Sequence, residues 1–395
     1  MLGYVFGIFN SDPLVQLKLL IPFILLSIGF GLLGAIRLHR LHKESKRFIG
    51  HLVMATLSAY FVFTLLISLL NPTGTSYGAA QPVIIVFGVL YLLLFGFTLL
   101  LFSLLVKIKR LHQNWKFLTR AYYAGHLALL LLLGYGAYIE PFWLDTTYTT
   151  LPASSFAPGS PPLKIVLFSD LHMERWGRRE DEALAAIRKL EPDLLLVSGD
   201  LINVDHYQPE TYADMHRFFM NLQARYGVYA VGGSVDDIAE TRAALQGTPV
   251  HFLNNEIARL EINDNKIEIL GIPSHYRDDG QMLEDLSAEL NPDAYKILLY
   301  HTPDLAKEKS LANINLYLAG HTHGGQIALP FVGAIFTASR YGTEYAAGLY
   351  KLANPGNTRL YVTRGLGFEG MNTPRIRLFA RPEISALTLV PPNRL

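Results

Sequence analysis

Six side chains of the kind that binds metal ions each follow a short apolar segment of the chain. In chain order they are Asp170, His172, Asp200, His301, His321 and His323. Imidazole and carboxylate groups together suit divalent ions such as Zn, Fe and Mn. If the apolar segments are strands of an α/β sheet, their carboxyl ends meet at one edge, where such domains collect their functional groups. The sequence therefore predicts a metal site at that edge.

The number and spacing of these ligands favour a pair of ions. In an extended segment, side chains two residues apart point the same way, so Asp170 and His172 can bind an ion from one side, as can His321 and His323. Six ligands with a bridging carboxylate are too many for one tetrahedral ion. Two ions about 3.5–4 Å apart stabilise both the attacking and the leaving oxygen of a phosphoryl transfer. A lone Asp-x-His or Gly-Asp is usually part of a loop, but four different motifs of metal-binding residues, each at a strand end, indicate a functional centre.

The segments that must position these residues alternate between strand and helix. Near-continuous apolar runs predict buried strands at 163–168, 194–197, 228–231, 267–272, 297–300 and 316–318. Apolar residues at helical spacing predict a helix over 180–190. This alternation is typical of an α/β domain.

The motifs Asp170-x-His172, Gly199-Asp200, His301 and Gly320-His321-x-His323 resemble those of the calcineurin-like metallophosphoesterase superfamily. The segments 320–334 (GHTHGGQIALPFVGA), 345–350 (YAAGLY), 360–367 (LYVTRGLG) and 381–389 (RPEISALTL) are similar to the membrane-associated bacterial branch of YkuE- and YaeI-like phosphoesterases. The resemblance covers about residues 163–390. It implies an αββα sandwich with a dinuclear metal site at the sheet edge.

The resemblance also implies a role for each ligand. Two divalent ions, Mn, Fe or Zn, would be the cofactors, and a metal-bound hydroxide would attack the phosphorus of a phosphate ester. Asp200 and His301 are the expected catalytic residues. The ligands divide between the ions as follows: Asp170, His172 and His323 on the first, His301 and His321 on the second, and Asp200 as the bridge.

One motif departs from the family pattern. Where the family has Gly-Asn-His-Asp, this chain has Gly233-Ser234-Val235-Asp236. Ser234 takes the place of an asparagine that binds the second ion, and a hydroxyl is a weaker ligand. Val235 takes the place of the histidine that protonates the leaving oxygen, and valine cannot transfer a proton. Loss of a general acid typically slows a reaction about 10²–10⁴-fold; His206 or His275 could replace it.

The first third of the chain has the pattern of a membrane anchor. Four uncharged apolar runs, 19–36, 52–70, 82–106 and 121–139, have the length that a membrane-spanning helix needs. Basic residues concentrate between the first and second runs and between the third and fourth, whereas segment 71–81 carries no charge. By the positive-inside rule, both termini lie outside the cytoplasm. We expect His126, within the fourth run, to be a neutral side chain bonded to a neighbouring helix.

These patterns predict three parts: a four-helix transmembrane anchor over 1–144, a Pro/Ser/Gly-rich linker over 145–162 and a metallophosphoesterase domain over 163–395. The expected location is the bacterial inner membrane, in a multi-pass arrangement, with the catalytic domain extracytoplasmic. The bilayer is the expected partner, and no protein partner is predicted.

Composition excludes several other classes of function. The first 150 residues hold 11 Lys and Arg against 4 Asp and Glu, so the remainder of this chain of net charge +1 is acidic. An acidic domain lacks the basic surface of a nucleic-acid binder. The chain has no cysteine, which excludes disulfides and thiolate chemistry.

The sequence leaves two functions open. The first is a membrane-anchored, dinuclear-metal-dependent phosphoesterase acting on a phospholipid or lipid-linked substrate. Hydrolysis of UDP-2,3-diacylglucosamine is a variant of it that conflicts with the predicted sidedness, because nucleotide sugars are cytoplasmic. The second is a degenerate phosphoesterase that binds metal or phospholipid with little turnover, as Ser234 and Val235 suggest.

Overall fold

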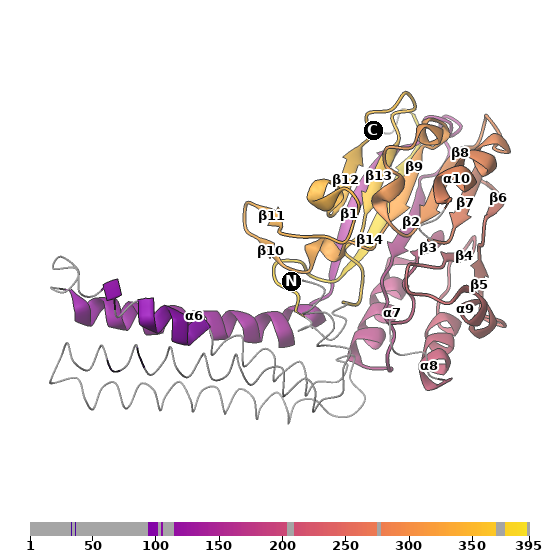
Figure 1. The fold of residues 1–395 in the computed structure, drawn as a ribbon. Coiled ribbons are helices and arrows are strands. Elements are labelled where there is room, and N and C mark those ends of the chain that lie inside the picture. The colour runs from indigo at the N-terminus through magenta and orange to yellow at the C-terminus, as the bar shows by residue number, and fades with distance from the viewer. Residues whose placement is uncertain are drawn as a thin grey trace. The chain divides into compact units, whose positions relative to one another are not determined.

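The computed structural model describes residues 114–203, 209–274, 278–368 and 376–392, together with residues 33, 36, 94–101, 104 and 105 (Figure 1). The chain forms two compact units. One contains Met1–Gly134 and Gly370–Arg375, and the other contains Tyr135–Glu369 and Ile376–Leu395.

Helix α6 (Trp115–Tyr138) is the main described element of the first unit and continues into the second. Among the described residues, one helical stretch, Arg120–Phe142, is long and apolar enough to cross a membrane, and it contains the fourth predicted span. The first three predicted spans lie largely outside the described residues, so the expected bundle is supported for one helix only. His126 is bonded to the neighbouring helical segment 94–101 as expected, since its Nε2 lies 3.1 Å from Thr98 Oγ1.

The second unit contains two six-stranded sheets. The strands of the first sheet lie in the order β1 (Asp145–Pro152), β14 (Glu383–Val390), β2 (Leu163–Phe168), β3 (Leu194–Ser198), β4 (Val228–Val231) and β5 (Val250–Phe252). Strands β2 to β5 run parallel, and β14 runs antiparallel to β2.

The second sheet is also mixed. Its order is β12 (Gly348–Lys351), β13 (Arg359–Val362), β9 (Leu316–Ala319), β8 (Tyr295–Tyr300), β7 (Asn265–Ile272) and β6 (Glu256–Ile262). Strands β7, β8, β9 and β13 run parallel, whereas β6 and β12 are antiparallel edges.

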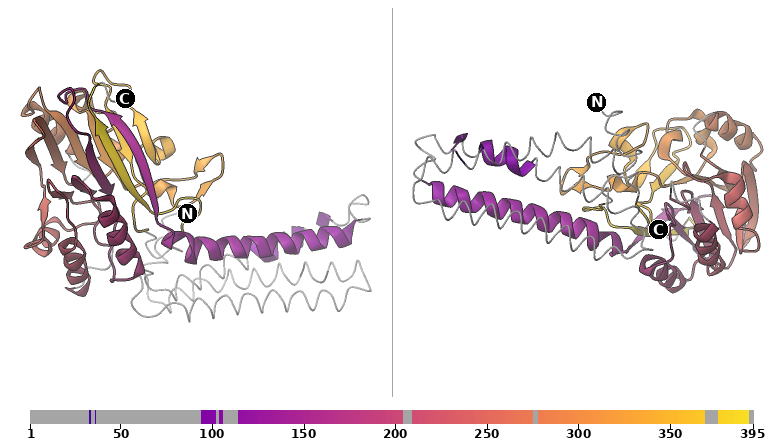
Figure 2. Two further views of the ribbon diagram at one scale, coloured as in Figure 1. Left: turned by 180° about the vertical axis from the view of Figure 1, so that it is seen from behind. Right: turned by 60° about the horizontal axis from the view of Figure 1, so that its bottom comes forward.

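Helices cover the outer faces of both sheets (Figure 2). Alternate residues of β2, such as Ile165 and Leu167, pack with Ile269 and Leu299 of the second sheet in a core between the sheets. The intervening Val166 faces helices α7 (Arg178–Leu190), α8 (Pro209–Met220) and α9 (Ile238–Ala244), and α10 (Asp279–Ala288) covers the second sheet. The two packed sheets with helices on their outer faces confirm the predicted α/β sandwich. Strands that are buried on both faces need such covering layers.

All six predicted strands and the predicted helix exist, with ends that shift by at most two residues. Short 3₁₀ turns occur at Glu140–Phe142, Pro303–Leu305, Lys309–Asn313, His323–Gly325 and Gly342–Tyr345. A small hairpin, β10 (Ala328–Leu329) and β11 (Gly333–Ala334), stands away from both sheets (Figures 1 and 2).

The expected linker over 145–162 requires a correction. Its first eight residues form β1, which pairs in parallel with β14 along its whole length. Ala153 and Phe156 are then buried in the core between the sheets. The Thr-rich segment DTTYTTLP has the composition of a strand, and the later prolines and glycine obscured that signal. The first strand of the sandwich therefore begins at Asp145, with only Trp143 and Leu144 between it and the 3₁₀ turn.

Candidate metal centre

The six sequence-predicted ligands come together at the carboxyl ends of four strands, two from each sheet. Asp170 and His172 follow β2, Asp200 follows β3, His301 follows β8, and His321 with His323 follows β9. All are buried except His321, which is half-buried. The side chains form two groups, each able to hold an ion: Asp170, His172 and His323 in one, and Asp200, His301 and His321 in the other.

The first group joins the two sheets. His323 Nε2 lies 3.5 Å from Asp170 Oδ1 and 3.2 Å from His172 Nε2, and the two imidazole rings are stacked. The Asp170 carboxylate also accepts hydrogen bonds from the Ser169 hydroxyl and from His321 N. Three donor atoms from two loops, one after β2 and one after β9, thus face a common point.

Asp200, a member of the second group, also faces the first group. Its Oδ2 is 3.0 Å from His301 Nε2 in the second group and 3.9 Å from His172 Nε2 in the first. A carboxylate in this place is suited to the bridging role that the resemblance implies.

The grouping differs from the expectation for residues two apart in an extended segment. His321 and His323 diverge, one to each group. These segments are not extended: the backbone is left-handed at five of the six ligands, with φ between 43° and 70°; the five are Asp170, His172, Asp200, His321 and His323. Such a conformation is uncommon outside glycine and is concentrated at functional sites.

Interlocking hydrogen bonds hold these loops in place. Asp170 N donates to Gly199 O at 2.9 Å, and His172 N donates to Asp200 O at 3.0 Å. A Cβ atom at Gly233 would lie 2.1 Å from Asp200 Oδ1, and one at Gly320 would lie 2.1 Å from Ser169 Oγ. Side chains at either position would push the ligand loops apart.

The protonation of His301 follows from its partners. Its Nδ1 lies 2.7 Å from the carbonyl oxygen of Ser198, which can only accept, so Nδ1 carries the hydrogen. The Nε2 atom is buried and makes no hydrogen bond among the described residues, although Asp200 Oδ2 is 3.0 Å away. A lone pair facing a carboxylate oxygen at that distance needs a cation between them, either a proton or a metal ion.

Electrostatics of the metal-free site agree with this geometry. Burial lowers the pKa of His301, but Asp200 raises it more, to about 10. Burial raises the pKa of Asp200, yet His301 and the other imidazoles hold it below its ordinary value. Burial raises the pKa of Asp170 to about 6, and burial together with His301 lowers the pKa of His321 to about 4. In the absence of metal, a proton on His301 holds this acid–base cluster together.

The donor set fits divalent metal ions. Nε2 atoms of His172 and His323 face each other at 3.2 Å. Two imidazole nitrogens bound to one tetrahedral ion at about 2.0–2.1 Å would lie roughly 3.3 Å apart. The six nitrogen and oxygen donors are of the type that Zn, Fe and Mn take.

Ser234 and Val235 lie beside this centre. Ser234 Oγ is 3.3 Å from both carboxylate oxygens of Asp200, and Val235 N donates to Asp200 Oδ1 at 3.1 Å. Asp236 accepts hydrogen bonds from the main-chain nitrogens of Leu201 and Gly233 and so joins the two loops. Ser234 and Val235 line a cavity of about 1080 Å³ together with Tyr212 and Glu240. His206 and His275, the two proposed replacements for the missing acid, lie outside the described residues.

Sequence reasoning missed the buried Arg377. Its guanidinium Nη2 lies 3.3 Å from His323 Nδ1, and it donates to the carbonyl oxygens of Gly367, Arg364 and Ala380. Burial lowers the pKa of Arg377 to about 9. No spacing pattern links position 377 to the ligands, so only the fold could reveal it.

Comparisons with known proteins agree with the geometry. Residues 163–361 match the family model described as the calcineurin-like phosphoesterase superfamily domain. The metallophosphoesterase YkuE of Bacillus subtilis is 34% identical over 275 residues, which cover 66% of this chain and 90% of that protein. The phosphodiesterase YaeI of Escherichia coli is 28% identical over 265 residues, covering 65% and 92%. A transmembrane protein with a metallophosphoesterase domain from Bos taurus is 32% identical over 263 residues, covering 62% and 56%.

Proposed function

Because this chain belongs to the calcineurin-like phosphoesterase superfamily, we propose that it is a membrane-anchored hydrolase that uses two divalent metal ions to cleave a phosphate ester of a phospholipid or lipid-linked substrate. Water forms the new P–O bond and the bond to the leaving oxygen breaks; the leaving group departs as an alkoxide or phenolate and takes up a proton from water afterwards. The observation that carries this proposal is the pair of three-residue groups with Asp200 between them.

The contacts of the six residues suggest which of them would bind each ion. Asp170, His172 and His323 would hold one ion, and His301 with His321 the other, with Asp200 as the bridge. Ions bound there would act as Lewis acids on the phosphoryl group and lower the pKa of water. The Ser198 carbonyl keeps His301 in the tautomer that offers Nε2. Ser234 stands at the second group, 3.3 Å from Asp200.

The leaving group is the point at which this enzyme departs from its family. Val235 offers no proton, so the departing oxygen has to leave with little protonation. Esters with acidic leaving groups, such as aryl alcohols, tolerate this best, because they are stable as anions. We infer that alkyl esters react much more slowly than aryl esters, by about 10²–10⁴-fold beyond their intrinsic difference.

The membrane part of the proposal rests on α6 and on the charge pattern. The Arg120–Phe142 stretch satisfies the length and hydropathy of a span, and the positive-inside rule puts the catalytic domain outside the cytoplasm. We place the protein in the bacterial inner membrane with several spans. A C-terminal alkaline phosphatase fusion should be active. An inactive fusion would reverse the sidedness and favour UDP-2,3-diacylglucosamine as substrate.

The Ser234-Val235 pair also supports a second candidate, a binding protein that holds metal or phospholipid without turnover. The two are separated by assaying the full chain in lipid nanodiscs with Mn²⁺, using an aryl and an alkyl phosphodiester, and measuring metal content in parallel. We expect two ions and hydrolysis of at least the aryl ester. A silent native protein beside an active Ser234→Asn/Val235→His variant would establish the binding protein instead.

A further inference from the structure

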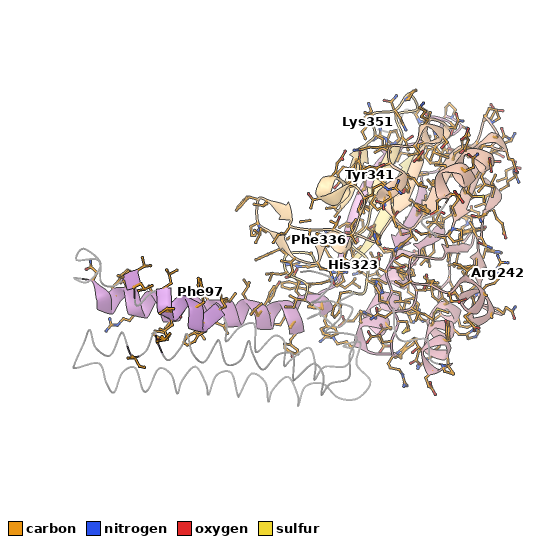
Figure 3. All side chains as sticks on the ribbon, in the orientation of Figure 1. Phe97, Arg242, His323, Phe336, Tyr341 and Lys351 are labelled. Carbon is orange, nitrogen blue, oxygen red and sulfur yellow. The ribbon has the colours of Figure 1, made fainter. Side chains whose placement is uncertain are left out.

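The β10–β11 hairpin exposes an apolar surface beside the metal centre. Phe331 is fully exposed at its tip, and Val332 and Phe336 are each 73% exposed. Ile327, Leu329 and Ile335 add to the same surface. The hairpin follows the His323–Gly325 turn in the chain, and Figure 3 labels Phe336 of the hairpin and His323 of the turn. We call residues 327–336 the apolar hairpin.

Its composition is that of a membrane-contacting segment. No Asp, Glu, Lys or Arg occurs from Gln326 to Ser339. Two phenylalanines, two isoleucines, a leucine and a valine in ten residues are rarely left in water together, because exposed apolar patches mark interaction surfaces. The strands hold two residues each, so the hairpin has little core of its own.

The base of the hairpin is bonded to the same segment as the end of the candidate span. Leu378 N donates to Gln326 O at 2.8 Å, and Ala328 N donates to Leu378 O at 2.8 Å. The preceding residue, Arg377, donates its main-chain N–H to Gly136 O of α6 at 2.9 Å. All of these residues belong to the second unit. The base of the hairpin and the end of the candidate span are therefore bonded to two consecutive residues, Leu378 and Arg377.

The connection to the membrane is short as well. The candidate span ends at Phe142 and β1 begins at Asp145. The three Cα–Cα steps from Phe142 to Asp145 span about 10 Å when the chain is extended. Strand β1 therefore cannot lie far from a bilayer that contains this helix. The hydrogen bonds through Arg377 and Leu378 tie the base of the apolar hairpin to the Gly136 turn of that helix.

We propose that the apolar hairpin inserts into the interfacial layer of the bilayer that α6 enters, as a second membrane contact of the catalytic domain. The proposal rests on the membrane placement given under the proposed function, not on turnover. Insertion would hold the loop that carries His323 at the depth of lipid headgroups. A phosphoester in the headgroup layer could then reach the metal centre without leaving the membrane.

The absence of cysteine from the chain permits a direct test. The full-length Phe331→Cys protein carries a single environment-sensitive NBD label in nanodiscs of phosphatidylethanolamine and phosphatidylglycerol. Val332→Cys serves as a second position, in case the first disturbs the turn. Met220→Cys, an apolar residue 47% exposed at the end of α8, is the matched control.

We expect the label at 331 or 332 to emit at shorter wavelength than at 220 and to be quenched by doxyl lipids. Iodide in the water should quench it roughly threefold less than the label at 220, as for interfacial anchors. Equal iodide quenching at the three positions would overturn the proposal. Protection from both iodide and doxyl lipid would also overturn it, because a protein surface would then cover the hairpin.

A second measurement separates this inference from the proposed function. In the Phe331→Ser/Phe336→Ser variant, hydrolysis of a vesicle-borne phosphoester should fall about tenfold relative to hydrolysis of a soluble aryl ester, since insertion scales with apolar area. Lipid quenching without any hydrolysis would refute the enzyme and leave the insertion standing. Hydrolysis of vesicle-borne ester that is unchanged in the variant would refute the role of insertion and leave the enzyme standing.

Discussion

The main-chain nitrogen of Val235 donates a hydrogen bond to Asp200 Oδ1 at 3.1 Å. The residue at the position of the missing proton donor therefore supports the carboxylate between the two ligand groups through its backbone. Ser234 Oγ lies 3.3 Å from the same carboxylate. Ser234 and Val235, which depart from the motif that the resemblance implies, thus both contact Asp200.

Val235→His should restore proton transfer without disturbing that hydrogen bond, because the backbone is unchanged. We expect kcat/KM for an alkyl phosphodiester to rise about 10²-fold, and for an aryl diester by much less. Steady-state kinetics with both esters measures the difference. Val235→Ala is the control and should leave kcat/KM unchanged for both esters. Equal gains for the two esters would contradict the assignment of the leaving-group step.

Asp200→Asn should remove the bridge between the ligand groups. Oδ2 lies within 3.9 Å of imidazoles from both groups, so loss of its charge weakens both sites. We expect bound metal to fall from two ions to one or none, and activity to fall about 10³-fold, as when an electrostatic element of a metal centre is lost. Elemental analysis after dialysis gives the metal content. Asp285→Asn, at an exposed position of α10, is the control and should retain both ions. An Asp200→Asn variant that still binds two ions would disprove the bridging role.

Metal affinity should rise with pH. Burial lowers the pKa of His301, but Asp200 raises it further, to about 10, so the metal-free site holds a proton that a metal ion has to displace. Below that pKa, each pH unit should strengthen binding about tenfold per proton released. Calorimetry between pH 6 and 9, in buffers of different ionisation enthalpy, measures the protons released. Binding that is independent of pH would show that His301 is already deprotonated.

The same raised pKa predicts the stability of the metal-free protein. A histidine whose pKa is higher in the folded state stabilises fully below its unfolded value, about 6.5, and that contribution is lost as pH rises towards 10. We expect the metal-free protein to unfold at lower denaturant concentration at pH 9 than at pH 6. His301→Gln should flatten this dependence. A wild-type profile already flat over this range would argue against the His301–Asp200 pairing.

Arg377→Met should destabilise the domain. Loss of the guanidinium leaves the buried carbonyl oxygens of Gly367 and Ala380 without a donor. An unsatisfied buried acceptor costs about 1–3 kcal/mol, so we expect a loss of roughly 3 kcal/mol and a lower Tm. Thermal unfolding of the full chain measures it. Arg242→Met, at an exposed position of α9, is the matched control and should unfold like the native protein.

Much of the domain could be predicted because its signals are local. Apolar runs of strand length identify β2, β3, β4, β7, β8 and β9, and the ligands stand directly after them. Strand β1 was missed, since its Thr-rich sequence adjoins a Pro-rich segment and acquires a partner only when β14, more than 200 residues later, lies beside it.

The sequence by itself identified six side chains as candidate ligands, and the division that the family resemblance implies is the same as the two groups that the structure forms. Spacing alone would have paired His321 with His323. The tertiary structure separates them, because this segment is not extended: His321 joins Asp200 and His301, and His323 joins Asp170 and His172. It also placed Arg377 Nη2 3.3 Å from His323 Nδ1 and bonded the base of the apolar hairpin to Leu378, next to the residue that is bonded to Gly136 of α6. These relationships join residues far apart in the chain, and only the packing of two sheets and the path of the loops between them brings such residues into contact.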